Sequence, residues 1–299
     1  MGTPQTSEEA DPVLAALVEE PFRIVRPERP AVPFVFASPH AGRLYPLNFL
    51  AQSRLSPLAL RRSEDAYIDE LFEGVAALGA PLLAARFPRV YLDVNRAADE
   101  LDGRMFETPP AETDPLSPRV AAGLGVIPRV VREGVEIYPS RLKLAEAEER
   151  LARFYRPYHA ALAGLVEETR QRFGAAVVVD CHSMPSSPAA PAVVFGDCHG
   201  ASASSSLRHH AERAFESCGF STACNTPYAG GHTTHLYARR QAGIHALQIE
   251  VNRALYMDEE RVEKTACFTE IRDRLTAALA ALLCFNAEAL RPPRPLAAE

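Results

Sequence analysis

Short apolar runs alternate along this chain with longer amphipathic stretches, which is the pattern of an α/β fold. The apolar runs predict strands at residues 33–38, 81–86, 89–94, 175–180, 192–197 and 244–252. Apolar residues at helical spacing predict helices at residues 63–78, 140–174, 204–218 and 258–284, with Pro157 splitting or kinking the second. The alternation predicts a three-layer α/β/α fold, and the nearly continuous apolar strands indicate a largely parallel sheet buried on both faces.

The two ends of the chain and one internal segment lack this periodicity. Residues 1–20 are expected to form a flexible N-terminal segment, and residues 291–299 a disordered tail. Residues 21–290 between them are predicted to form a single domain. Within it, residues 100–139 are rich in proline and glycine, which predicts an ordered excursion or lid and not a second domain.

Composition narrows the classes of function. The net charge of −6 argues against general nucleic-acid binding, which needs a basic face. No apolar run reaches about 18 residues, so no transmembrane helix is predicted. The six cysteines contain no C-x-x-C pair and the N-terminus has no basic-then-apolar signal, so we expect a reduced, cytoplasmic protein.

Polar side chains stand at the ends of four predicted strands. In open α/β sheets, ligands bind beyond the carboxyl ends of the strands. We therefore expect one crevice to gather the five side chains found at those ends: His40, Asn95, Arg96, His182 and Glu250.

These residue types suit metal-assisted hydrolysis. Two histidines and one carboxylate around Zn²⁺ leave the open position that a catalytic zinc site needs, although Fe²⁺, Mn²⁺ or Co²⁺ would suit the same ligands. Glu250 lies in an apolar run, so it should either take a proton from a metal-activated water or pair with a cation such as Arg253. An arginine would hold the substrate carboxylate. The set predicts hydrolysis of an N-acyl amino acid or of a C-terminal peptide bond.

Asp-Cys-His occurs twice, each time at the end of a predicted strand. A hydrolase with Cys181 or Cys198 as nucleophile is one explanation. It is disfavoured because His182 would point to the opposite face of its strand from Cys181.

The preferred explanation makes His182 a metal ligand that Asp180 orients, with His199 as the alternative ligand. The two cysteines are then small buried residues. A third explanation, a non-catalytic binding protein on the same scaffold, is disfavoured because a candidate exists for every catalytic role.

Several stretches of the chain resemble one known family, and they occur in the same order as in that family. They are SPHAGRLYP (38–46), SEDAYIDELF (63–72), RVYLDVNRAADELDG (89–103), VVVDCHSMPS (177–186), FGDCHGAS (195–202), and TPYAGGHTTHLYA through LQIEVNRALYMDE (226–259). In these stretches the sequence resembles the N-formylglutamate amidohydrolase family, which is similar in turn to zinc carboxypeptidases and aspartoacylase-type deacylases. The resemblance implies a mixed sheet between helices and one zinc ion per chain.

The resemblance also implies roles for single residues. His40 and His182 match metal-ligating histidines, Asn95 and Arg96 match a pair that grips the substrate carboxylate, and Glu250 matches the catalytic glutamate. The implied substrate is a small molecule, N-formyl-L-glutamate, cleaved to formate and L-glutamate in histidine degradation. The sequence does not predict the oligomeric state.

One position departs from the carboxypeptidase pattern. Where those enzymes have the glutamate of H-x-x-E, this chain has Arg43, which cannot coordinate zinc. We expect the third ligand to come from the acidic pair Glu64 and Asp65, and the family pattern favours Asp65. Arg43 and His232, the latter on a glycine-rich turn, are further candidates for binding the substrate.

Overall fold

The computed structural model describes residues 11–111, 117–132 and 134–291. Its centre is a seven-stranded sheet with the strand order β1-β3-β2-β6-β9-β7-β8. The strands are β1 (Phe22–Val25), β2 (Phe34–Ser38), β3 (Leu82–Ala85), β6 (Ala176–Met184), β7 (Val193–Gly196), β8 (Thr222–Cys224) and β9 (Ile244–Asn252). Strands β3, β2, β6 and β9 are mutually parallel, whereas β1 and β7 run antiparallel to their neighbours β3 and β9. The predicted mixed, largely parallel sheet is confirmed.

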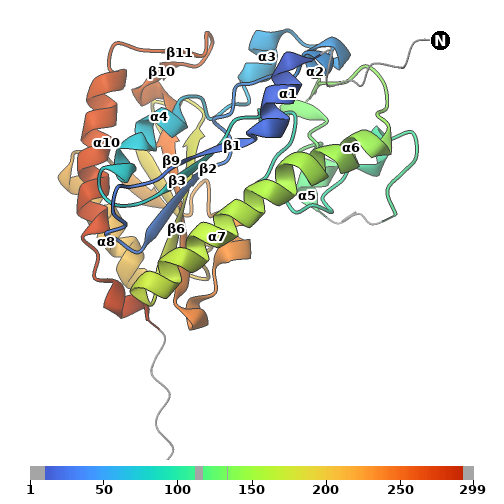
Figure 1. The fold of residues 1–299 in the computed structure, drawn as a ribbon. Helices are drawn as coiled ribbons and strands as arrows, with labels where there is room; N and C mark the ends of the chain where they lie inside the picture. The colour runs from blue at the N-terminus through green and yellow to red at the C-terminus, as the bar shows by residue number, and fades with distance from the viewer. Residues whose placement is uncertain (1–10, 112–116, 133, 292–299) are drawn as a thin grey trace, which may run out of the picture.

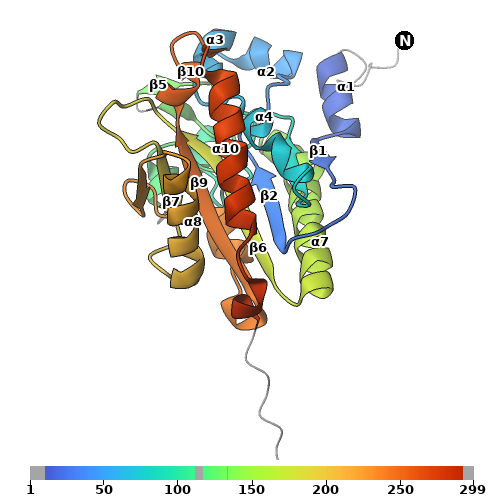
Figure 2. The same cartoon turned by 90° about the vertical axis from the view of Figure 1, so that its left-hand side faces the viewer.

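Helices cover both faces of this sheet (Figure 1). One face packs against α4 (Ile68–Phe72), α8 (Ser205–Ser217) and α10 (Phe268–Leu283). The other packs against α1 (Pro12–Glu19), α2 (Leu47–Gln52), α3 (Pro57–Arg61), α6 (Leu144–Arg150), α7 (Arg156–Phe173) and α9 (His232–Tyr237). Seen from the side, α10 and α7 stand on opposite faces of the sheet (Figure 2). The fold therefore has the three layers that the sequence predicts.

Strand β6 shows why these residues form a central strand. Val177, Val179 and Cys181 belong to the core under α4, α8 and α10, whereas Val178 belongs to the core under α7. All nine of its residues are buried, so both faces of the strand are covered by helices. The apolar run of the sequence follows from this double burial.

Near the carboxyl ends of the central strands, two elements differ from the sequence prediction. The helix predicted from residue 63 begins only at Ile68, because the Asp65 N–H donates to the His40 carbonyl (3.0 Å) and Tyr67 takes a left-handed backbone conformation. The strand predicted at 89–94 is wrong: these residues form turns, in which the Tyr91 N–H donates to the Pro88 carbonyl (2.9 Å). Both departures place side chains beside His40.

Two long predicted helices are only partly as expected. The helix predicted at 258–284 begins at Phe268, and the residues before it form the hairpin β10 (Met257–Asp258) and β11 (Glu263–Lys264). The helix predicted at 140–174 is present as α6 and α7, joined by a π-helical turn at Leu151–Tyr155. Pro157 follows that turn, so the helical run widens there without ending.

The proline- and glycine-rich excursion is ordered where the structure describes it. It contains a 3₁₀ turn (Gly103–Met105), α5 (Pro118–Ala121) and the hairpin β4 (Val130–Arg132) and β5 (Val135–Glu136). Further 3₁₀ turns lie at Glu73–Ala76, Arg240–Ala242, Arg253–Leu255 and Ala287–Leu290. No described helix is long and apolar enough to cross a membrane.

The ends of the chain differ from the prediction in one respect. Residues 1–10 and 292–299 lie outside the described residues. Residues 12–19, expected to be flexible, form α1, because the Asp11 carboxylate caps the helix and Leu17 is fully buried. The prediction of a flexible segment is wrong for these residues.

Candidate active site

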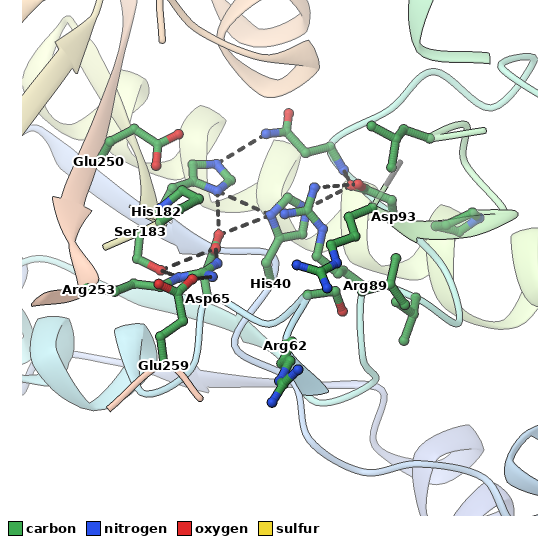
Figure 3. Close-up of a pocket in the computed structure, with 18 of the residues that line it drawn as sticks. His40, Arg62, Asp65, Arg89, Asp93, His182, Ser183, Glu250, Arg253 and Glu259 are labelled. Carbon is green, nitrogen blue, oxygen red and sulfur yellow. Dashed lines mark hydrogen bonds and ion pairs between the residues drawn. The ribbon is translucent and has the colours of Figure 1, made fainter. Parts of the chain in front are cut away.

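A cavity of about 1080 Å³ opens at the carboxyl ends of the central parallel strands (Figure 3). It is lined by six of the residues that the sequence singles out, namely His40, Asp65, Asn95, Arg96, His182 and Glu250. The predicted convergence of strand ends is thus present in the structure. Residues of the excursion, among them Arg119 and Val130, form another part of the wall.

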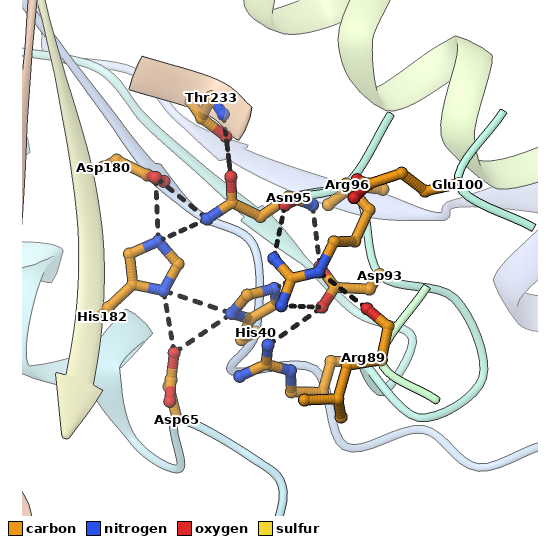
Figure 4. Close-up of polar contacts among 12 residues, drawn as sticks. His40, Asp65, Arg89, Asp93, Asn95, Arg96, Glu100, Asp180, His182 and Thr233 are labelled. Carbon is orange, nitrogen blue, oxygen red and sulfur yellow. Dashed lines mark hydrogen bonds and ion pairs between the residues drawn. The ribbon is translucent and has the colours of Figure 1, made fainter. Parts of the chain in front are cut away.

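His40, Asp65 and His182 form a tight, buried triangle of possible ligand atoms (Figure 4). His40 Nδ1 lies 3.2 Å from both Asp65 Oδ2 and His182 Nδ1, and His182 Nδ1 lies 2.9 Å from Asp65 Oδ2. These spacings are close to the distance of about 3.3 Å between two ligands of one tetrahedral zinc ion. The triangle is therefore a candidate metal centre.

Each histidine has a carboxylate behind it. Asp93 Oδ1 lies 2.7 Å from His40 Nε2, and Asp180 Oδ2 lies 2.9 Å from His182 Nε2. A carboxylate can only accept here, so each Nε2 carries a hydrogen and each Nδ1 faces into the triangle. Burial lowers the pKa of His182, but Asp180 and Asp65 overcome this and raise it well above its usual range. The cluster attracts positive charge.

Asp65 is held in place from its other side. Its Oδ1 accepts from Arg253 Nη2 (3.0 Å) and from Ser183 Oγ (3.3 Å), which leaves Oδ2 for the triangle. Burial raises the pKa of Asp65, but hydrogen bonds from His182 and His40 overcome this and lower it well below its usual value. Asp65 is therefore an anionic candidate ligand.

Glu64, the alternative ligand, is turned away from the histidines. Its Oε1 accepts from the Tyr45 hydroxyl (2.7 Å) and from Arg61 Nε (3.1 Å). Of the acidic pair, Asp65 is the residue that faces the two histidines.

Glu250 stands beside His182 because β6 and β9 are parallel and pair these two residues in register. Its Oε1 accepts from Gln248 Nε2 (2.7 Å). Burial raises the pKa of Glu250 to about 7, while the charge of His182 lowers it. The predicted alternative, an ion pair with Arg253, is not formed, since Arg253 binds Asp65 and Glu259 instead. Glu250 therefore has a proton affinity that suits proton transfer near neutral pH.

Asn95 and Arg96 line the cavity but differ in what they offer. The Asn95 amide group is occupied by the protein: its Nδ2 donates to Asp180 (3.2 Å) and its Oδ1 accepts from the Thr233 N–H (2.8 Å). Arg96 donates from Nε to the Leu124 carbonyl (2.9 Å), and its Nη2 lies 3.7 Å from the nearest carboxylate oxygen. Of the two, Arg96 is the better placed to bind an anion.

Two residues predicted to bind the substrate, Arg43 and His232, do not line the cavity. The Arg43 guanidinium is turned outward and pairs with Asp69 (2.8 Å) and Glu70 (3.0 Å). The Nε2 of His232 lies 3.3 Å from the Tyr155 hydroxyl. Its neighbour Thr233, and not His232, contacts Asn95.

The cysteine explanation finds no support in the geometry. Cys181 is fully buried in the core on the face of β6 opposite His182, and burial raises the pKa of its thiol well above the usual value. His199 is exposed and does not line the cavity. The Cys198 N–H donates to the Ala229 carbonyl (2.6 Å), so this second Asp-Cys-His supports the glycine-rich turn.

A sequence model of the N-formylglutamate amidohydrolase family matches residues 32–257. The chain belongs to this family. The predicted membership is confirmed, and with it the predicted class of enzyme, a hydrolase of non-peptide amide bonds.

Relatives agree with this assignment. An N-formylglutamate deformylase of Pseudomonas aeruginosa is 29% identical over 244 residues, which cover 78% of this chain and 85% of the relative. One from Pseudomonas putida is 28% identical over 241 residues, or 76% of this chain and 83% of the relative. The crystal structure of an N-formylglutamate amidohydrolase from Ralstonia eutropha JMP134 superposes with a TM-score of 0.82 and 37% identity, covering 90% of this chain and 98% of the other.

This amidohydrolase-family site also contains residues that the sequence reasoning missed. Arg89 and Asp93 lie in the segment predicted to be a strand, and Arg89 Nη2 donates to Asp93 Oδ2 (2.9 Å). Gln248 and Ser183 support Glu250 and Asp65. Asp93 stands two residues before Asn95 in the sequence, and its Oδ1 accepts the Asn95 N–H (2.8 Å).

Proposed function

We propose that this protein hydrolyses N-formyl-L-glutamate to formate and L-glutamate with the help of one divalent metal ion per chain. Zinc is the ion that we propose first. The observation that carries the proposal is the buried His40–Asp65–His182 triangle beside the Glu250 carboxylate. The names of the relatives supply the substrate.

The residues present fit a metal ion. The triangle offers two imidazole nitrogens and one carboxylate oxygen, and each of its three residues is fixed from behind by Asp93, Asp180 or Arg253. This donor set suits Zn²⁺ and also Fe²⁺, Mn²⁺ or Co²⁺. Such an ion, when bound, polarises a carbonyl and lowers the pKa of water.

Glu250 would move the protons of the reaction. Its carboxylate accepts a proton from the water that attacks the formyl carbon, and it returns that proton to the amide nitrogen as the C–N bond breaks. The oxygen of the water ends in formate, and the nitrogen leaves as the amine of glutamate. A pKa of about 7 suits both steps, because the group can then gain and lose a proton near neutral pH.

Arg96 would hold the carboxylate next to the scissile amide. Its guanidinium lies on the cavity wall formed by the segment that also carries Asp93. Asn95 would act differently from the expectation: by bridging Asp180 and Thr233 it steadies the partner of His182. In this proposal Arg96 holds the substrate, whereas the Asn95 side chain holds Asp180 in place beside His182.

We further propose that the protein works on this small molecule in the cytoplasm. All six cysteines are unpaired, which fits a reducing compartment.

The test is the release of formate from N-formyl-L-glutamate, compared with the release of acetate from N-acetyl-L-glutamate. The comparison matters because a cavity of about 1080 Å³ has room for a larger acyl group. We expect the formyl compound to be preferred and Glu250→Gln to lower turnover by about 10²–10⁴-fold. A preference for the acetyl compound would indicate another N-acyl amino acid deacylase, and binding without turnover of either would indicate a binding protein.

A further inference from the structure

The arginines that line the cavity are unequally supplied with negative partners. They are Arg62, Arg89, Arg96, Arg119, Arg132 and Arg253. Arg89 pairs with Asp93, and Arg253 pairs with Asp65 and Glu259. Among the residues that the structure describes, no carboxylate lies within 4.0 Å of the guanidinium nitrogens of Arg62, Arg119 or Arg132. This part of the wall therefore has positive charge available for an anionic ligand.

Of these three, Arg119 is the least exposed and the one whose charge acts on Arg96. Arg62 and Arg132 are exposed, whereas Arg119 is only partly exposed, and its charge lowers the pKa of Arg96 after the larger effects of burial and of Arg89. Arg119 also lowers the pKa of His232, again after burial. The charge of Arg119 therefore reaches both Arg96 and His232.

The backbone around Arg119 is tied to that same segment. Ser117 caps α5 and donates from Oγ to Glu100 Oε1 (2.6 Å), while Glu100 Oε2 accepts the Ala97 N–H (2.9 Å). Arg96 in turn donates to the Leu124 carbonyl, three residues after α5. The excursion therefore sets Arg119 in a fixed relation to Arg96.

We infer that Arg119 binds the side-chain carboxylate of the substrate and so selects N-formyl amino acids with an acidic side chain. This inference rests on the proposed function. N-formyl-L-glutamate carries two carboxylates separated by a short chain, so a cation beside Arg96 suits the second one. A neutral side chain would leave the Arg119 guanidinium partly desolvated without a partner, which is how a polar site rejects an uncharged analogue.

The test compares N-formyl-L-glutamate with N-formyl-L-glutamine, which has nearly the same shape without the charge. The variants are Arg119→Met, Arg119→Lys and, as a matched control, Arg141→Met, which removes an exposed arginine outside the cavity. For Arg119→Met we expect kcat/KM to fall by about 10²–10³-fold on the formylglutamate and by less than about threefold on the formylglutamine. The kcat/KM of Arg119→Lys on the formylglutamate should lie between those of the wild type and Arg119→Met. The kcat/KM values of Arg141→Met should match those of the wild type.

Calorimetric binding of L-glutamate provides a second measurement that needs no turnover. Arg119→Met should weaken binding of L-glutamate and leave binding of L-glutamine unchanged. Equal losses on both compounds, or a change of preference in Arg132→Met and not in Arg119→Met, would overturn the inference. A wild type that releases formate from neither compound would contradict the proposed function itself and this inference with it.

Discussion

Replacing Glu250 with glutamine should stabilise the metal-free protein while removing most of its activity. Glu250 is only 7% exposed, and burial raises its pKa to about 7 from an ordinary value of 4.5. Because the pKa is higher in the folded state, ionisation of Glu250 opposes folding. The cost is absent below pH 4.5, grows between pH 4.5 and 7, and is complete above pH 7.

The size of the effect follows from the same two values. A change of one in pKa corresponds to about 1.4 kcal/mol, so ionised Glu250 costs the fold roughly 3 kcal/mol. Glutamine keeps the shape of the side chain and the oxygen that accepts from Gln248 Nε2 (2.7 Å). Above neutral pH we expect the free energy of unfolding to rise by up to about 3 kcal/mol, or Tm by about 5 °C for a chain of this size. Turnover should fall by about 10²–10⁴-fold, because the general base is lost.

The assay is denaturant unfolding of the chelator-treated wild type and Glu250→Gln at about pH 5.5 and about pH 8, paired with formate release by the metal-loaded proteins. Glu270→Gln, an exposed site on α10, controls for the loss of one negative charge. The reasoning is refuted if Glu250→Gln is less stable than the wild type at the higher pH, if its gain is equal at both pH values, or if it keeps its turnover.

Three further substitutions test other parts of the site. Asp180→Asn should weaken metal binding by about 10–100-fold, because Asp180 fixes the His182 ring; an unchanged affinity in chelator competition would contradict this. Cys181→Ala should keep wild-type turnover and lose about 1 kcal/mol of stability, whereas an inactive but folded variant would restore the cysteine mechanism. Arg43→Met should leave KM unchanged and stability within about 1 kcal/mol, since Arg43 pairs with Asp69 at the surface; a large rise in KM would return Arg43 to the substrate site.

Much of the fold could be predicted because the central strands are buried on both faces. Their apolar runs are continuous, so the strand at 244–252 is found with its observed bounds. His40, His182 and Glu250 could be predicted as a group for the same reason, since each stands at or near the carboxyl end of such a strand.

The rest depends on contacts between distant residues. Asp65 leaves its expected helix because its N–H bonds to the His40 carbonyl, and its carboxylate is fixed by Arg253, 188 positions later in the sequence. Arg43 follows His40 closely, but Gly42 lies so near the Phe87 carbonyl that a Cβ would approach its oxygen to 2.0 Å. The direction of the chain after Gly42, and with it the outward turn of Arg43, is set by that packing and not by local sequence.

The most direct test of the account is the metal content of the purified protein measured together with formate release from N-formyl-L-glutamate. We expect about one divalent ion per chain, loss of formate release when a chelator removes it, and recovery when Zn²⁺ is restored. His182→Ala should bind no metal and release no formate. Metal-free protein that hydrolyses N-formyl-L-glutamate at the full rate would contradict the account.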